Sequence, residues 1–174
     1  MNTRSSTGIV FFEKRLNSPP PELAIDSFRV RQFDFSSTDT EHWLRIHNRS
    51  SEPLTKGRVW TDGDFNREFA SLIANRRNPS TAKERLWFVE PAEASPVPIG
   101  TISMQPRDST QQSIGVINWL AVLPAYRRKG IATLLLNIVE RSSWEHDMKT
   151  IGLSTLATWA PAVAFYDSQG FKRR

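Results

Sequence analysis

Residues 113–144 constrain the fold of this chain more than any other segment. They begin with a mostly apolar run, SIGVINWLAV at 113–122, which is typical of a strand buried on both faces. From Ile131 onward, apolar residues recur at i, i+3, i+4, i+7 and i+8, which predicts an amphipathic helix over residues 130–144. A buried strand that leads into such a helix is typical of a layered domain built from both helices and strands.

The loop before this helix gathers positive charge, because Arg127, Arg128 and Lys129 directly precede Gly130. The first backbone N–H groups of a helix lack intrahelical partners, and the helix dipole adds partial positive charge there. A phosphate group fits such a site. Gly130 lets the backbone approach an anion closely, and Ala132 keeps the next exposed position small. The loop therefore predicts a phosphate-binding site.

Two short patterns identify the kind of phosphate ligand. The spacings GxxxxGK[ST] and GxGxxG are both absent from the sequence. The pattern R-x-x-G-x-A at 127–132 resembles the acetyl-coenzyme A signature of the GNAT family of N-acetyltransferases, and the preceding residues 120–127 are also similar. A second pattern, A-x-x-x-Y-x-x-x-G-F at 162–171, resembles that family's helix-to-strand segment. The resemblance covers residues 86–171, and the order of elements in residues 28–85 is compatible with it.

The resemblance implies an N-acetyltransferase that moves an acetyl group from acetyl-CoA to a primary amine. The amine would attack the thioester directly in a ternary complex, without a metal ion. The pyrophosphate would lie on backbone amides of residues 128–133, and the pantetheine arm would pair like a strand with residues 120–122. The cofactor-binding residues so implied are Leu120, Ala121, Val122, Arg127, Arg128, Lys129, Gly130, Ile131, Ala132 and Thr133.

The same resemblance implies Tyr166 as the acid that protonates the departing thiolate. The general base is not identified, because the 113–122 strand carries no Asp or Glu. Asn118 on that strand could orient a water molecule, and Glu90 is a more distant candidate base. Trp159 stands where the family often has an Asn that contacts the pantetheine. These departures keep a second hypothesis open: a degenerate or truncated fold that binds acyl-CoA without turnover.

The order of predicted elements is β, α, α, β, β, β, α, β, α, β. It predicts a mixed α+β fold, in which a central, largely antiparallel sheet is flanked by helices on both faces. Only three residues follow Phe171, so the final strand is expected to be short or missing. The strands are expected at residues 28–33, 86–90, 99–104, 113–122, 151–154 and from 171, and the helices at residues 38–48, 62–79, 130–144 and 161–170.

The chain has 174 residues, which is the size of one domain. We expect a flexible N-terminal arm over residues 1–27, because three consecutive prolines at 19–21 fit neither a helix nor a sheet. A single acetyltransferase-like domain would follow over residues 28–174. Residues 9–12 of the arm could supply the strand that the short C-terminus lacks, either within the chain or from a partner copy.

Composition narrows the class of function further. The chain has no cysteine, which excludes disulfides and thiolate chemistry, and its histidines, His42, His47 and His146, do not favour a metal site. The acidic start at residues 62–66 lacks the Gly and Glu that a calcium loop needs. The net charge of +5 permits nucleic acid as a partner, but aromatic residues do not interleave with the basic ones. We expect a cytoplasmic monomer or homodimer with no membrane span, whose acceptor is a small-molecule or peptide amine.

Overall fold

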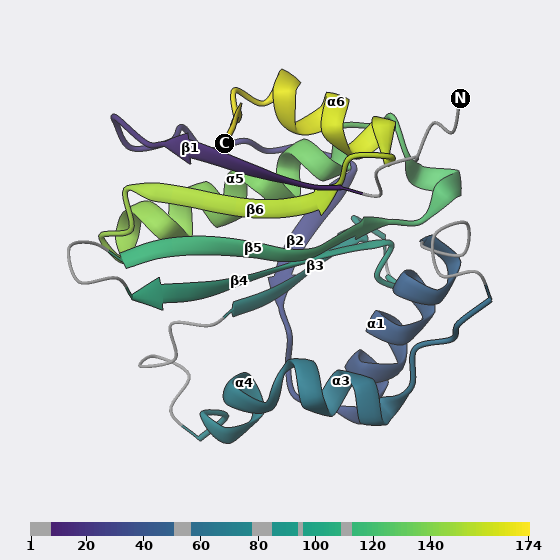
Figure 1. The fold of residues 1–174 in the computed structure, drawn as a ribbon. Helices are drawn as coiled ribbons and strands as arrows, with labels where there is room; N and C mark the ends of the chain where they lie inside the picture. Colours follow the sequence, from purple (N-terminus) through teal and green to yellow (C-terminus); the bar gives the residue numbers. More distant parts are fainter. Residues whose placement is uncertain (1–7, 51–56, 78–84, 94–95, 109–112) are drawn as a thin grey trace, which may run out of the picture.

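A computed structural model describes the chain except for residues 1–7, 51–56, 78–84, 94–95 and 109–112. Its centre is a seven-stranded sheet with the order β2-β3-β4-β5-β6-β1-β7, and only the β5–β6 pair is parallel (Figure 1). The strands are β1 (Ile9–Arg15), β2 (Phe28–Gln32), β3 (Arg85–Pro91), β4 (Gly100–Asp108), β5 (Ser113–Val122), β6 (Thr150–Leu156) and β7 (Lys172–Arg173). The helices are α1 (Ser37–Ser50), α3 (Asp62–Glu68), α4 (Ala70–Ala74), α5 (Ile131–Glu145) and α6 (Ala160–Ser168), with a short 3-10 turn, η1 (Pro124–Tyr126).

The helices cover the sheet on both faces. Ring contacts from Trp43 on α1 to Trp119 on β5 place α1 against one face. Phe12 and Lys14 lie two residues apart on β1 and so point to the same face; Phe12 packs on α6 and Lys14 pairs with Glu140 on α5. Helices α5 and α6 therefore share the other face. The expected mixed sheet, flanked by helices on both sides, is confirmed.

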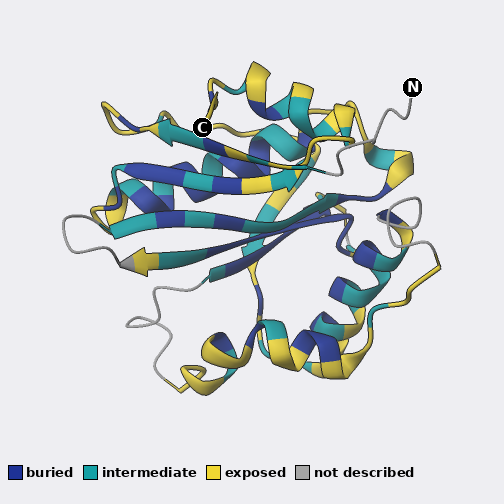
Figure 2. Ribbon diagram, viewed as in Figure 1, coloured by how far each residue is buried: buried dark blue, intermediate teal, exposed yellow. Residues whose placement is uncertain are grey.

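The core lies between the sheet and these helices, as the buried residues in Figure 2 show. Trp43, Phe65 and Phe69 fill the side under α1 and α3, and each is almost completely buried. Leu135 and Val139 on α5 fill the other side, as the apolar periodicity of this helix predicts. The two cores hold β5 firmly between them, although most of its residues are only half buried rather than buried on both faces as expected.

The expected helix over residues 62–79 is broken into α3 and α4. It begins as a capping box, in which the Thr61 side chain accepts from the Asp64 amide and the Asp64 carboxylate accepts from the Thr61 amide. The break falls at Phe69, whose backbone (φ −109°, ψ 24°) leaves the helical region while its ring is fully buried against Trp43. The expected end of the helix at residues 78–79 lies outside the described residues.

One strand is longer than expected. Strand β4 continues to Asp108, beyond the expected end at residue 104, because residues 105–108 pair with residues 113–116 of β5. Residues 109–112, between these two strands, lie outside the described residues. At the other end of the chain, β7 is only two residues long, as the short C-terminus predicts.

Strand β1 confirms the hypothesis that residues 9–12 supply a strand to the sheet from within the chain. It lies within residues 1–27, where we expected a flexible arm, yet it pairs along its whole length with β6 and also with β7. The cause is apolar burial, because Phe12 packs against Tyr166 at 5.7 Å between ring centroids and is 2% exposed. The N-terminal segment thus fills the gap beside the short C-terminal strand from within the same chain.

Adjacent residues of β1 give a direct measure of its contribution to stability. Phe12→Ala should lower the free energy of unfolding by about 3–5 kcal/mol, because it removes a buried ring. Phe11→Ala should change it by less than about 0.5 kcal/mol, because that ring is 57% exposed on the opposite face. Urea unfolding of both variants checks this, and equal effects would show that β1 is not packed as described.

Candidate active site

A bulge in β5 shapes the centre of the sheet. Thr101 pairs with Ala121 and Ser103 pairs with Asn118, so two residues of β5 stand opposite one residue of β4. One of them, Trp119, has a positive φ of 56°, which is rare for a bulky residue and costs of order 1–3 kcal/mol. A bulge bends its strand and increases the local twist. Strand β5 therefore changes direction near Trp119.

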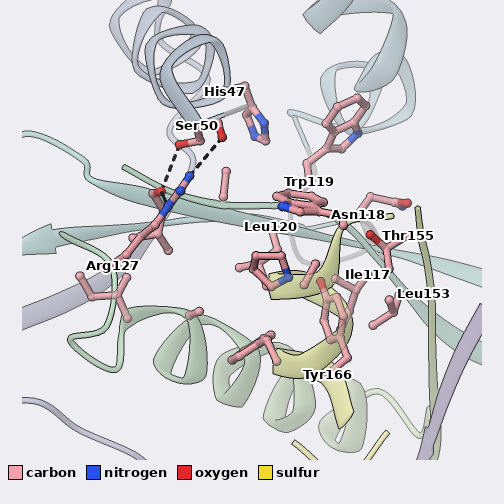
Figure 3. Close-up of a pocket in the computed structure, with 18 of the residues that line it drawn as sticks. His47, Ser50, Ile117, Asn118, Trp119, Leu120, Arg127, Leu153, Thr155 and Tyr166 are labelled. Atoms are coloured by element: carbon pink, nitrogen blue, oxygen red, sulfur yellow. Dashed lines mark hydrogen bonds between the residues drawn. The ribbon is translucent and has the colours of Figure 1, made fainter. Parts of the chain in front are cut away.

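Beyond a short parallel stretch, β5 and β6 are no longer hydrogen-bonded to each other. Their pairing covers only residues 114–116 of β5 and residues 150–152 of β6. A cavity of about 790 Å³ lies where the strands separate, lined by residues 117–122 of β5, residues 153–155 of β6, the first turn of α5 and one side of α6 (Figure 3). The edge of β5 that faces this cavity can therefore accept an extended ligand as an additional strand.

The cavity brings together nearly all of the residues that the sequence singled out. Helix α5 begins at its mouth, and Gly130, with φ 80°, occupies the N-cap position without a side-chain cap. A Cβ atom added to Gly130 would lie 3.1 Å from Cδ1 of Ile25, so both the backbone angle and the space favour glycine. The expected site residues that line the cavity are Leu120, Ala121, Val122, Arg127, Arg128, Gly130, Ile131, Ala132, Thr133 and Tyr166.

The basic side chains of the loop have different surroundings from those expected. The Arg127 guanidinium donates to the carbonyl oxygens of Val122 and Ser50, each at 3.1 Å, and so ties the end of α1 to the end of β5 (Figure 3). The Lys129 ammonium lies 5.3 Å from the ring centre of Tyr126, and Lys129 does not line the cavity. Of these two residues only Arg127 lines the cavity, and its guanidinium is already bonded to backbone oxygens.

Tyr166 points into the cavity from α6 (Figure 3). Its ring is held between Phe12 and Phe171, at 5.7 and 5.6 Å between centroids. Burial raises the pKa of its hydroxyl well above the usual value of about 10, because the charged phenolate would lose its hydration. At neutral pH the hydroxyl is therefore protonated, and it can donate a hydrogen bond but cannot act as a base.

The candidates for the base lie in different places. Asn118 lines the cavity, where its side-chain amide donates to Gln105 at 3.3 Å. Glu90 does not line the cavity; it is buried on β3 and forms ion pairs with Arg29, at 3.2 Å, and with Arg31. Its carboxylate is bound by two guanidinium groups outside the cavity, so it does not face an amine in the cavity. Among the described residues that line the cavity, Glu68 on α3 is the only carboxylate.

Two further residues complete the site. Trp159, noted as a departure from the family pattern, occupies the N-cap of α6 and lines the cavity. His47 on α1 is 4% exposed and also lines the cavity. Burial lowers the pKa of His47 to about 3, because the charged ring would lose its hydration. A hydrogen bond with the backbone of Trp119 raises the pKa, but by less. The i, i+4 spacing from Trp43 was the available signal that His47 faces inward.

Neither a metal site nor a membrane span is found in the part of the chain that the structure describes. There, no three His, Asp or Glu side chains gather in a way that could hold a metal ion. None of the described helices is both long enough and apolar enough to cross a bilayer. Among the described residues that line the cavity, the charged side chains are those of Glu68, Arg127 and Arg128.

Known proteins resemble this chain in sequence pattern and in fold. A family model described as the acetyltransferase (GNAT) family matches residues 34–171. A GCN5-related N-acetyltransferase from Sphaerobacter thermophilus is similar over 95% of this chain, with a TM-score of 0.69 and 17% identity; this chain spans 48% of that protein's length.

Two smaller proteins are covered more fully. Glucosamine-6-phosphate N-acetyltransferase from Arabidopsis thaliana has a TM-score of 0.63 and 16% identity, over 85% of this chain and 93% of that one. The aminoglycoside 6'-N-acetyltransferase AAC(6')-IG from Acinetobacter haemolyticus has a TM-score of 0.61 and 17% identity, over 83% and 90%. At these identities the likeness shows a shared fold.

The buried His47 predicts a specific dependence of stability on pH. Its pKa is about 3 in the folded chain and about 6.5 when unfolded, so the unfolded chain takes up the proton first as the pH falls. This residue should therefore remove about 2 kcal/mol of stability between pH 7 and pH 5. The variant His47→Gln should lack that part of the loss in urea unfolding at the two pH values. An identical loss in both proteins would contradict the buried, neutral state of His47.

Proposed function

This chain belongs to the GNAT family of acetyltransferases, and from that membership we propose that it transfers an acetyl group from acetyl-CoA to a primary amine by direct attack. One observation carries the proposal: a single cavity joins the uncapped N-terminus of α5 to the open edge of β5. The first feature suits a pyrophosphate and the second suits an extended amide-containing chain. A CoA thioester contains both groups in one molecule, because its amide-containing pantetheine arm is attached directly to its pyrophosphate.

The residues of the cavity fit such a ligand. The backbone amides of residues 128–133 would hold the pyrophosphate, helped by the partial positive charge of the helix start. Residues 120–122 would pair with the pantetheine arm along the open edge of β5. Arg128 lines the cavity and can add a full charge, whereas Arg127 would hold β5 in position through its bond to Val122.

The transfer itself exchanges two bonds. Acetyl-CoA supplies an acyl group that is already activated as a thioester. A C–N bond forms as the amine attacks the carbonyl carbon, and the C–S bond breaks to leave the CoA thiolate, with one proton lost from the amine and one gained by sulfur. Backbone N–H groups on the open edge of β5 would stabilise the negative charge that develops on the carbonyl oxygen.

Tyr166 would act on the sulfur. Its hydroxyl stays protonated because burial raises its pKa, which also lies above the value of about 8.5 for an ordinary thiol. Tyr166 would therefore stabilise the departing thiolate chiefly as a hydrogen-bond donor. Proton removal from the amine requires another group, and Asn118 and the neutral His47 are the polar side chains of α1 and β5 that could position a water molecule for it.

Calorimetric titration of the full chain with acetyl-CoA, followed by a thiol-release assay with a panel of amines, tests this function. We expect saturable binding and amine-dependent release of the CoA thiol. Binding with no release for any amine would favour the alternative, a protein that binds acyl-CoA without turnover. Absence of binding would overturn the proposal.

The site at Gly130 can be blocked with a matched control. Gly130→Glu places a carboxylate at the start of α5, and we expect it to weaken acetyl-CoA binding by about 100-fold or more through charge repulsion and loss of space. Gly170 has nearly the same φ, 81°, with open space around it, so Gly170→Glu carries the same backbone strain away from the α5 helix start. Calorimetry on both variants separates the two causes; equal weakening would attribute the effect to strain alone.

Tyr166→Phe tests the role of the hydroxyl. Loss of a hydrogen bond formed only as the thiolate departs should lower kcat by about 10–100-fold and leave the Kd for acetyl-CoA almost unchanged. The ring packing against Phe12 and Phe171 is retained, so the melting temperature should not fall. Steady-state kinetics with calorimetry checks this, and an unchanged kcat would remove Tyr166 from the mechanism.

A further inference from the structure

The side of the cavity that lies against α1 and α3 is walled by aromatic rings. Trp60, just before α3, meets Trp119 of the β5 bulge at 4.8 Å between ring centroids and nearly at right angles. Behind them, Trp43 and His47 of α1 each lie within 5.5 Å of Trp119. Trp60, Trp119 and His47 all line the cavity. A ligand on this side therefore meets flat, mostly apolar surfaces.

These rings are fixed before any ligand arrives. The side-chain amide of Asn48 accepts from the backbone N–H of Trp60 at 2.7 Å and donates to its carbonyl at 3.1 Å. The Arg58 guanidinium lies 4.7 Å from the Trp60 ring centre and is itself paired with Asp64 at 3.0 Å. Trp119 is held by the bulge and by the rings behind it. Such a rigid surface can select a ligand by shape at little entropic cost.

The charges of this wall exclude several kinds of amine. Among the described lining residues only Glu68 is acidic, whereas a polycation such as an aminoglycoside or a polyamine requires several carboxylates. The lining Arg residues, Arg127 and Arg128, lie in the loop before α5, and the Arg127 guanidinium is already bonded to backbone oxygens. Among the described residues, the cation nearest the aromatic wall is Arg58, which does not line the cavity and is paired with Asp64, so this side disfavours an acceptor that carries a phosphate.

An apolar wall also bears on how the amine loses its proton. An alkylammonium ion has a pKa of about 10 and is mostly charged at neutral pH. Burial against apolar surface disfavours the charged form, so the pKa of the amine falls on binding. Free amine then becomes available for attack without a strong base, which fits a site where His47 is a very weak base and Glu90 does not line the cavity.

From this wall we infer the class of acceptor: a small monoamine whose amino group is carried on an aromatic or branched apolar body. The inference rests on the proposed acetyl transfer. The body packs against Trp60 and Trp119, and the amino group reaches the point where β5 and β6 separate. The reaction is the acetyl transfer written above, with the proton of the buried amine leaving through water.

A panel of acceptors tests the inference with the full chain. Phenethylamine and tryptamine represent the proposed class, and spermidine, kanamycin, glucosamine 6-phosphate and a short unmodified peptide represent the others. We expect kcat/KM to be about tenfold or more higher for the aromatic monoamines, which is the discrimination that ring packing can supply. Calorimetry with phenethylamine in the presence of CoA measures binding without turnover.

Variants locate the selectivity at the aromatic wall. Trp60→Ala should raise both the KM and the calorimetric Kd for phenethylamine about tenfold and leave the Kd for acetyl-CoA unchanged. Trp60→Phe keeps a ring and should restore most of the affinity, which also guards against misfolding as the cause. Trp144→Ala is the matched control, because Trp144 lies on α5 beneath Lys149 and does not line the cavity.

Each outcome is decisive. A preference for phenethylamine or tryptamine that falls with Trp60→Ala supports the inference. Turnover that is fastest with spermidine, kanamycin, glucosamine 6-phosphate or the peptide overturns the inference and leaves acetyl transfer standing. Absence of acetyl-CoA binding, or of thiol release with every amine, overturns the proposed function and this inference together.

Discussion

The separation of β5 from β6 is the constraint on which the rest of the molecule depends. On one side, eight residues of β5 pair with β4, whereas on the other side only three residues of β5 pair with β6. Backbone N–H and C=O groups that lose a strand partner must find another partner or face solvent. The open edge of β5 can therefore pair with an extended ligand. The bulge at Trp119 bends β5 away, and the Arg127 guanidinium ties the end of that bent strand to α1.

The N-terminal strand β1 covers the edge of β6 that does not face β5. Strand β6 would be an exposed edge if β1 did not pair with it, and an exposed edge invites association with other chains. Strand β1 also carries Phe12, which supports the ring of Tyr166 from one side while Phe171 supports it from another. The position of a proposed catalytic hydroxyl thus depends on residues at both ends of the chain, which meet only in the folded sheet.

Local patterns in the sequence predicted many of the helices and strands. The periodicity from Ile131 predicted α5 to within one residue at each end, and the run at 113–122 predicted β5, because both signals are local. The sequence raised residues 9–12 as a possible strand but could not assign its partners, which lie about 140 residues away in β6. Nor could it assign the Arg127 guanidinium to the oxygens of Ser50 and Val122, or fix the aromatic wall. Those features depend on long-range packing, whereas the pattern at 127–132 is local, and most of its residues line the cavity.

Hydrogen exchange of the backbone amides, with and without acetyl-CoA, tests the central claim most directly. The claim is that the open edge of β5 and the start of α5 form one ligand site. Added acetyl-CoA should slow exchange in residues 117–122 and in residues 128–133 together, with little change in β2 and β3. Protection confined to other elements, or its absence at both segments despite saturating acetyl-CoA, would contradict the account.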